Sequence, residues 1–270
     1  MEKSVNFFAL SHIGNSRDNQ EDSFLLHQGG ILPSDVREEM EHSRTPYHKF
    51  YSHNKSNFMV AVSDGMGGHA SGEVASSLTI KYLSENYQRL IESAYLNEQF
   101  IANEICAINR MVVDSSRKDN RLKGMGATLC GVICSNGMYY GFNVGDSRLY
   151  RYHNQLEQLS TDHTEGQRLR KLNLLTEEEC QRFPRRKHLY KYIGVNSELA
   201  ADVFKIGHCV SESILMLCSD GLTDALNNEE IANILSKDGN IEYKGHLLID
   251  QALERNIGHG DNITLILIEF

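Results

Sequence analysis

The chain has no tryptophan, only three prolines and no cysteine pair at CxxC spacing. Because proline is so sparse, no linker is evident, and we expect one domain over residues 1–270. The six cysteines are scattered through apolar segments, as reduced core cysteines are, so no disulfide framework is predicted. No apolar run approaches the ~18 residues of a membrane span, and the N-terminus does not resemble a signal peptide. We therefore expect a cytoplasmic protein with no membrane partner.

Basic residues are also scarce, since 27 Lys and Arg stand against 36 Asp and Glu. The net charge of −9 argues against binding to nucleic acid or to an anionic membrane. One segment, 162–195, is nevertheless basic. Its eight bases are Arg168, Arg170, Lys171, Arg182, Arg185, Arg186, Lys187 and Lys191. They could attract acidic or phosphorylated substrate segments, or lie on ordinary solvated helices.

Short strand-like runs dominate both ends of the chain. Between them, Asn136-Gly137 and His153-Asn154 separate β-rich runs, which predicts a meander of antiparallel hairpins. Apolar residues at helical spacing predict three helices, over 74–94, 97–116 and 243–256. Because the helices come in blocks and do not alternate with each strand, the pattern favours an α+β fold with helices packed outside sheets.

The segment 28–56 is polar, mixed in charge and contains Gly29-Gly30 and two of the three prolines. This composition predicts an inserted surface loop. Its histidines, His42, His48 and His53, are expected to be exposed.

Carboxylates recur at the ends of the strand-like runs. They are Glu21, Asp22, Asp64, Asp146, Asp220 and Asp261. A single such aspartate is most often a turn residue or a helix cap. Several at one rim of a sheet would repel each other unless cations lay between them. Oxygen ligands without His or Cys at zinc spacing favour Mg²⁺ or Mn²⁺, so the sequence predicts a site for hard divalent cations.

Two residues extend this prediction. Gly65 has no side chain, so its carbonyl group can approach a cation. Arg17, four residues before Glu21, is suited to bidentate capture of a phosphate group, although an exposed ion pair is an equally ordinary role. Paired cations activate water and neutralise phosphate charge, so this combination predicts hydrolysis of a phosphoester.

Seven sequence blocks in the same order resemble the metal-dependent serine/threonine protein phosphatases of type 2C, in their bacterial-like form. The blocks are SRDNQED, VSDGMGGHASGE, MGATL, NVGDSRLY, STDHT, CSDGLTD and GDNIT. The resemblance implies a four-layer α-β-β-α sandwich of two antiparallel sheets with two divalent cations, Mn²⁺ or Mg²⁺, at one end. It also implies hydrolysis of phosphoserine and phosphothreonine by a metal-bridging hydroxide.

The resemblance implies ligands for each cation. Asp64 would bridge the two ions, Gly65 would lend its carbonyl group, and Asp220 and Asp261 would complete the first site. Asp146, together with Asp220, would form the third cation site of bacterial-type members.

The remaining residues of the blocks would act around these ligands. Glu21 and Asp22 would hold metal-bound waters, and Arg17 would bind the substrate phosphate. Asp224, one helical turn after Asp220, is a weaker candidate for the third cation. The segment 162–195 corresponds to the flap beside the active site.

One residue departs from many relatives. These have His two residues after the bridging aspartate, as the proposed proton donor, whereas this chain has Met66. A metal-bound water or another group must then protonate the leaving group. His69, nearby, is expected to be structural.

Three other interpretations remain open. A catalytically weak or inactive regulatory relative would bind phosphopeptides with the same fold. A dinucleotide-binding enzyme is suggested by GMGGHA, but Asp64 would repel a pyrophosphate there. A calcium module is disfavoured because EF-hand spacing is lacking. The predicted partners are phosphorylated proteins and a cognate kinase pathway, with no nucleic acid, and the chain is expected to be monomeric.

Overall fold

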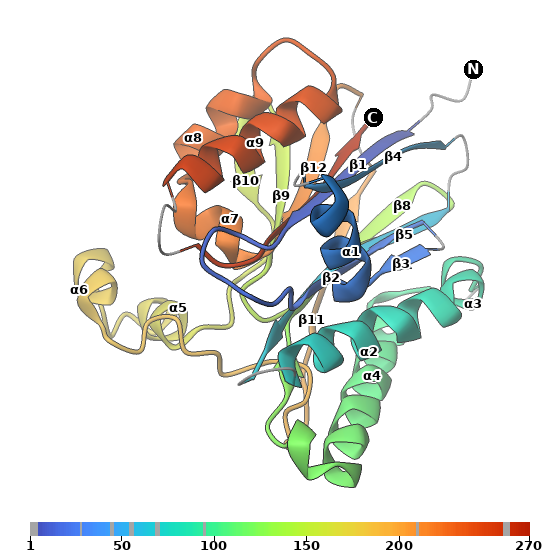
Figure 1. The fold of residues 1–270 in the computed structure, drawn as a ribbon, viewed down its shortest axis with the longest axis vertical. Coiled ribbons are helices and arrows are strands. Elements are labelled where there is room, and N and C mark those ends of the chain that lie inside the picture. The colour runs from blue at the N-terminus through green and yellow to red at the C-terminus, as the bar shows by residue number, and fades with distance from the viewer. Residues whose placement is uncertain are drawn as a thin grey trace.

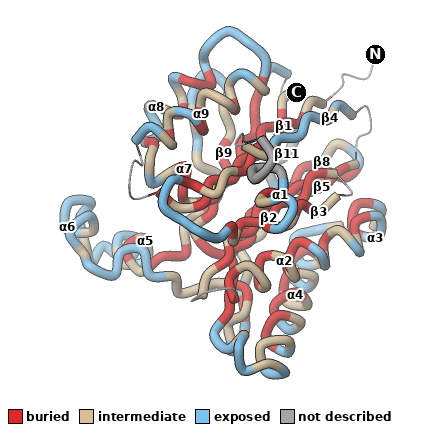
Figure 2. Tube along the Cα trace, in the orientation of Figure 1, coloured by how far each residue is buried: buried red, intermediate tan, exposed pale blue. Residues whose placement is uncertain are grey.

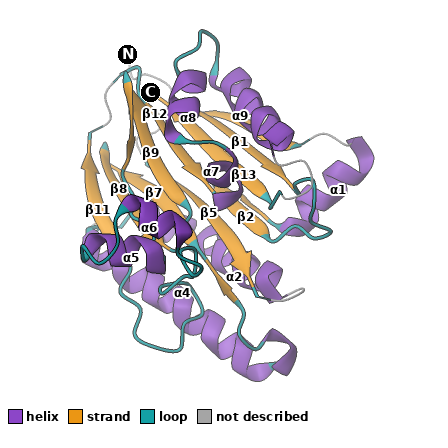
Figure 3. Ribbon diagram, turned by 90° about the vertical axis from the view of Figure 1, so that its left-hand side faces the viewer, coloured by secondary structure: helices purple, strands orange, loops and turns teal. Residues whose placement is uncertain are grey.

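The computed structural model describes residues 5–27, 29–43, 46–53, 57–67, 71–93, 96–208, 211–255 and 260–270. These residues form two antiparallel sheets that face each other, with helices on both outer sides (Figure 1, Figure 3). The predicted α+β sandwich is therefore confirmed. No helix in these ranges is long and apolar enough to cross a membrane.

Sheet A runs in the order β10, β9, β12, β13, β1, β4. Its strands are β10 (Gln155–Gln158), β9 (Arg148–His153), β12 (Ile214–Cys218), β13 (Ile263–Glu269), β1 (Val5–His12) and β4 (Tyr47–His53). Sheet B runs in the order β11, β8, β7, β5, β2, β3, and the short strand β6 pairs with the end of β5. Its strands are β11 (Asp202–Gly207), β8 (Met138–Val144), β7 (Leu129–Ser135), β5 (Phe58–Met66), β2 (Asp22–Leu26), β3 (Gly29–Ile31) and β6 (Gly126–Ala127).

The central strands are apolar on both faces because each face packs against a different layer. Along β5, Phe58, Val60 and Val62 point into the core between the sheets. The alternate residues Met59 and Ala61 point outward, into the core beneath the helices of sheet B. Buried residues accordingly run along the strands in Figure 2. This explains why the sequence shows continuous apolar runs there.

Helices cover the outer face of each sheet. Sheet B is covered by α2 (Ser71–Glu85), α3 (Tyr87–Ile91) and α4 (Glu98–Lys118). Sheet A is covered by α7 (Asp220–Ala225), α8 (Asn228–Leu235) and α9 (Ile241–Arg255). The short helices α5 (Glu165–Lys171) and α6 (Glu177–Arg182) project from one end of the sandwich (Figure 1).

The helix predictions are largely confirmed. The predicted helix 97–116 is α4, which begins where the Asn97 side chain accepts a hydrogen bond from the Phe100 amide. The predicted helix 243–256 is α9, whose last described residue is Arg255. The predicted helix 74–94 is two helices in the structure, because α2 ends at Glu85 and α3 starts at Tyr87. The prediction of one continuous helix is therefore wrong.

The prediction of an inserted surface loop over 28–56 is wrong for its described residues. They form β3, α1 (Pro33–Ser43) and β4, and β4 pairs with β1 along its whole length. Tyr47 and Tyr51 lie on the same face of β4 and, partly buried, pack against the core between the sheets. The neighbouring residues are mostly polar, so the composition of the segment hid this strand. His48 is exposed as expected, while the side chains of His42 and His53 lie outside the described residues.

The predicted meander is correct only within each sheet. Asn136 and Gly137 have positive φ and form the β7–β8 hairpin, and Asn154 does the same between β9 and β10. Between Val144 and Arg148, however, the chain crosses from sheet B to sheet A. This crossing carries Asp146 to one end of the sandwich.

The core between the sheets should dominate stability. Phe58 on β5 is 1% exposed and packs edge-on against Phe7 of the opposite sheet. We expect Phe58→Ala to lower the free energy of unfolding by about 3–5 kcal/mol in urea titrations, because it opens a cavity between the sheets. Phe50→Ala is the matched control, since Phe50 is 51% exposed, and should change this energy by less than about 0.5 kcal/mol. Equal effects would contradict the assigned core.

Candidate active site

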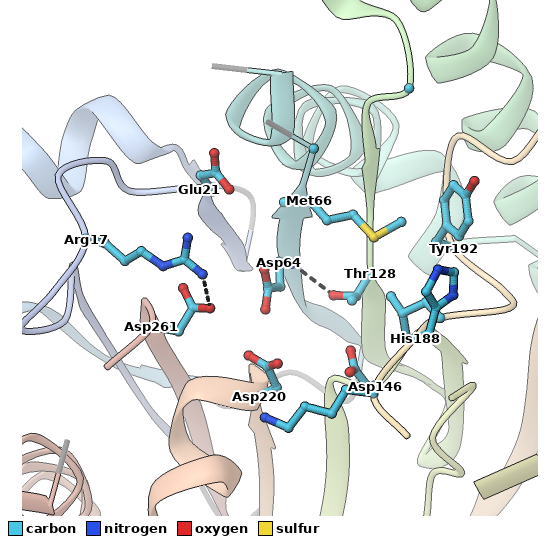
Figure 4. A pocket seen from close by; sticks show the side chains of 15 residues that line it. Arg17, Glu21, Asp64, Met66, Thr128, Asp146, His188, Tyr192, Asp220 and Asp261 are labelled. Carbon is cyan, nitrogen blue, oxygen red and sulfur yellow. Dashed lines mark hydrogen bonds and ion pairs between the residues drawn. The ribbon is translucent and has the colours of Figure 1, made fainter. Parts of the chain in front are cut away.

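A cavity of about 630 Å³ opens at the end of the sandwich where β5 stops and α7 begins. Most of the predicted site residues line it. They are Arg17, Glu21, Asp64, Gly65, Asp146, Asp220 and Asp261. In Figure 4, Asp64 lies at the centre, with Arg17 and Asp261 on one side and His188 and Tyr192 on the other. Residues that are distant in the sequence thus share one cavity.

Asp64 is held by hydrogen bonds from the neighbouring strands. Its backbone amide donates to Thr128 Oγ1 at 2.9 Å, and its carbonyl group accepts from the Thr128 amide at 2.8 Å. Thr128 Oγ1 also lies 2.6 Å from Ser147 Oγ. On the other side, Asp64 is opposite Asp22 in the pairing of β2 with β5. The backbone that carries the central carboxylate is therefore fixed from both sides.

Close packing at the cavity requires a glycine at position 65. A Cβ atom at this position would lie 2.2 Å from the Gly72 carbonyl oxygen at the start of α2. The Gly65 amide donates to the Glu21 carbonyl at 3.1 Å. The glycines after Asp64 therefore allow β5, α2 and the chain before β2 to meet at the cavity.

Asp220 is the first residue of α7, and only Ser219 separates it from the end of β12. The preceding residue, Ser219, donates from Oγ to Asp22 Oδ2 at 2.8 Å and accepts from the Thr264 amide at 3.0 Å. Gly221 lies so close to β13 that a Cβ atom would be 2.1 Å from the Asn262 carbonyl oxygen. These contacts bring the ends of β12, β13 and β2 together.

Arg17 and Asp261 form an ion pair at 2.5 Å on the cavity rim. The loop that carries Arg17 is tied to the start of β13 by Asn262, whose Nδ2 donates to the carbonyl groups of Ile13 and Asn19. Asn262 Oδ1 accepts from the Glu21 amide at 2.8 Å. One side chain therefore fixes both ends of the loop.

Burial and mutual repulsion disfavour the charged forms of these acids. Burial, followed by the charges of Asp22 and Asp220, raises the pKa of Asp64 well above its ordinary value. Burial, followed by Asp224 and Asp261, raises the pKa of Asp220 to about 6. Burial is also the main cause that raises the pKa of Glu21 to about 7 and that of Asp146 well above its usual range.

The donor set fits divalent cations. Asp22 Oδ1 and Asp220 Oδ1 are buried and have no hydrogen-bond partner. Buried carboxylate oxygens without partners are costly unless a cation or solvent satisfies them. Within the described ranges, no group of three or more acidic, His or Cys side chains is arranged to hold a metal ion as it stands.

The flap segment, 162–195, borders the site. Asp224 pairs with Lys187 of the flap, and both line a smaller cavity that also includes Asp146 and Asp220. Several other flap bases are also paired, such as Arg168 with Glu165. These ion pairs reduce the expected attraction for acidic segments.

The wall opposite Arg17 includes Met66, at the end of β5, and Tyr192 of the flap. Met66 and Tyr192 both approach Gly126, where a Cβ atom would lie 2.8 Å from Met66 Cε and 2.7 Å from Tyr192 Cδ2. His188 lines the same cavity. His69, which was expected to be structural, lies outside the described residues.

Sequence reasoning missed the residues that hold the carboxylates in place. Thr128, Ser219 and Asn262 had no assigned role, and neither did His188 or Tyr192 in the cavity wall. The first three lie inside the recognised blocks, next to or near predicted ligands. A polar side chain at the end of a strand that is otherwise apolar was the signal that could have identified them.

Comparison with known proteins identifies the family of this chain. The sequence profile of the family described as protein phosphatase 2C matches residues 46–241. The serine/threonine phosphatase stp of Listeria welshimeri is 33% identical over 214 residues, covering 78% of this chain and 84% of that protein. Protein phosphatase PhpP of Streptococcus pneumoniae is 30% identical over 232 residues, covering 82% of this chain and 89% of its own.

Solved structures agree with this result. The serine/threonine phosphatase of S. agalactiae superposes with a TM-score of 0.80 at 26% identity, covering 98% of this chain and 99% of that chain. The catalytic domain of the serine/threonine protein phosphatase PstP, solved with two manganese ions, superposes with a TM-score of 0.75 at 26% identity, covering 99% of each chain. The chain belongs to the protein phosphatase 2C family. The resemblance inferred from the seven blocks, and the enzyme class that it implies, are confirmed.

The acid cluster should make stability depend on pH when cations are absent. The pKa of Asp22 is raised to about 7 and that of Asp220 to about 6, above their ordinary value of 3.8. The folded chain then binds more protons than the unfolded chain between about pH 4 and 7, so stability falls as pH rises. In chelator, we expect the free energy of unfolding to drop by about 1.4 kcal/mol per pH unit for each proton that the folded chain binds and the unfolded chain does not.

Urea unfolding at pH 5, 6 and 7 measures this slope. Asp220→Asn should flatten it, because one of the repelling groups is removed. Saturating Mn²⁺ should reverse it, because cations bind the ionised carboxylates. If the free energy of unfolding in chelator instead increased from pH 5 to pH 7, the electrostatic description of the cavity would be wrong.

Proposed function

We propose that this protein hydrolyses phosphoserine and phosphothreonine in proteins, in a reaction that depends on divalent cations. The observation that carries the proposal is the meeting of four aspartates and Arg17 in one cavity. The aspartates are Asp64, Asp146, Asp220 and Asp261. Relatives named as serine/threonine phosphatases, and the PstP structure with two manganese ions, support both the substrate class and the use of divalent metal.

The residues have separate proposed roles in holding cations. Asp64 would lie between two ions, Gly65 would offer its carbonyl group, and Asp220 and Asp261 would complete the first site. Asp146 would bind a third ion with Asp220 and, more weakly, Asp224. When bound, such cations supply a hydroxide nucleophile at neutral pH and offset negative charge on the phosphate. Glu21 and Asp22 would hold waters around the ions.

Arg17 would orient the substrate phosphate. Its guanidinium lies on the cavity rim and is half exposed, with Asp261 as its partner. A phosphate group that is bound between Arg17 and the carboxylate cluster would receive two parallel hydrogen bonds from the guanidinium. Met66 has no proton to donate, so the leaving oxygen must take its proton from water or from another side chain of the cavity.

The alternative of a regulatory phosphopeptide-binding relative is less well supported. Binding a phosphopeptide needs Arg17 but has no evident need for buried acids with oxygens that lack a partner, such as Asp22 and Asp220. A kinase that modifies the same substrates, a monomeric state and a cytoplasmic location remain predictions from the sequence.

Metal dependence is the first test. The pure protein should hydrolyse p-nitrophenyl phosphate and a phosphothreonine peptide with Mn²⁺ and lose this activity in chelator. Asp220→Asn should lower kcat on the order of 100-fold or more, because a proposed cation ligand is lost. Asp238→Asn, an exposed acid distant in sequence from the blocks, should leave kcat within about twofold.

Two results would redirect this proposal. Equal rates for the wild type and Asp220→Asn would remove the catalytic role of the acid cluster. No turnover by the wild type with any divalent cation, together with tight phosphopeptide binding, would identify the regulatory relative instead.

Arg17→Ala tests phosphate binding separately. Loss of a charge-assisted contact of about 1.5–3 kcal/mol predicts a decrease of about 10- to 100-fold in kcat/KM for the phosphopeptide. Competitive inhibition by inorganic phosphate should weaken in parallel. Arg121→Ala is the matched control, because Arg121 is 89% exposed and also pairs with an aspartate, Asp119. An unchanged phosphate inhibition constant in Arg17→Ala would contradict the role of Arg17.

A further inference from the structure

His163 is buried beside the active site, yet the mechanism above gives it no role. It belongs to the block STDHT, and its side chain is 1% exposed. A buried imidazole with polar partners on both ring nitrogens is held in one orientation. Its partners are Gly145, in the turn before Asp146, and Asp202, at the start of β11.

The first partner is the turn that carries Asp146. The Gly145 amide donates to His163 Nδ1 at 3.0 Å, and the His163 amide donates to the Gly145 carbonyl at 2.9 Å. Gly145 has φ of +110°, and a Cβ atom here would lie 2.6 Å from Thr128 Cγ2. The turn is therefore clamped between His163 and Thr128, which also holds the Asp64 backbone.

The second partner is Asp202 at the start of β11. His163 Nε2 lies 3.2 Å from Asp202 Oδ2, and Lys191 of the flap donates to Asp202 Oδ1 at 2.8 Å. The His163 carbonyl group accepts from the Tyr190 amide at 3.0 Å, and the Tyr190 ring packs edge-on against the imidazole. The flap segment that leads to Tyr192 is thus attached to His163.

These hydrogen bonds define the tautomer of the ring. Nδ1 accepts a backbone N–H and so carries no proton. The proton of the neutral imidazole is then on Nε2, which donates to Asp202. Nδ1 therefore contacts the turn before Asp146, and Nε2 contacts Asp202, which also accepts a hydrogen bond from Lys191 of the flap.

We propose that His163 is a positioning residue that sets the Asp146 turn and the flap wall at the correct distance from each other. This inference rests on the proposed phosphatase function, in which Asp146 would bind a cation. The inference adds that the part of the flap that lines the cavity contacts the substrate. His163 touches neither substrate nor cation and acts through Gly145 and Asp202.

Two substitutions separate the two contacts. In His163→Asn, the side-chain oxygen can take the place of Nδ1 and accept from Gly145, but the side chain is too short to reach Asp202. In His163→Gln, the longer amide can take the place of Nε2 and donate to Asp202, but Gly145 loses its acceptor. The same two changes at the exposed His153 are the matched controls.

The proposal predicts opposite effects of these variants. His163→Gln should lower kcat for p-nitrophenyl phosphate on the order of 10- to 100-fold and weaken Mn²⁺ binding in calorimetry, because Asp146 shifts. His163→Asn should keep Mn²⁺ affinity within about threefold but raise KM for a phosphothreonine peptide. It should also speed tryptic cleavage after Arg185, Arg186 or Lys187 about tenfold, because the flap anchor is lost.

Thermal unfolding checks that both variants are folded. If folded His163→Asn and His163→Gln behave alike in Mn²⁺ binding and in flap cleavage, or both match the wild type, the proposal is wrong. These two measurements do not require turnover. A wild type without phosphatase activity would therefore reject the proposed function, while calorimetry and proteolysis would still test the role of His163.

Discussion

Repulsion among buried carboxylates is the constraint on which the rest of this structure depends. Asp22 and Asp64 face each other on paired strands, and Asp220 lies close enough to raise the pKa of Asp64. Such an arrangement costs free energy, so it persists only if a large apolar core stabilises the sheets that carry it. Three apolar layers, between the sheets and beneath each set of helices, provide that stabilisation. Cations would then convert the repulsion into binding energy.

Small polar residues hold the acids without neutralising them. Thr128 and Asn262 hydrogen-bond to backbone groups, and Ser219 donates to Oδ2 of Asp22. Oδ1 of Asp22 and Oδ1 of Asp220 have no protein partner. This is the arrangement that a cation site requires, because the scaffold must be rigid while the ligand oxygens stay available. His163 holds the turn before Asp146 in the same way, because it accepts a hydrogen bond from the Gly145 amide and leaves the Asp146 carboxylate free of this contact.

Where sequence reasoning failed, the cause was contacts that are distant along the chain. The segment 28–56 looked like a loop because its composition is polar, yet β4 pairs with β1 and packs Tyr47 and Tyr51 against the core between the sheets. The meander was correct at each hairpin, where Asn and Gly adopt positive φ locally. It was incomplete between Val144 and Arg148, because the choice of sheet for the next strand depends on which neighbour pairs with it.

The sequence by itself determined most of the strands outside the segment 28–56, the main helices, the family and the acidic residues at strand ends. These depend on local periodicity and on short blocks with a chemical purpose. Only the tertiary structure decided that Asp22 lies opposite Asp64, that Asn262 ties down the loop of Arg17, and that His163 connects the Asp146 turn to the flap. Each of these contacts joins residues from different strands or loops. Their geometry follows from sheet pairing and core packing, which no local pattern of residues contains.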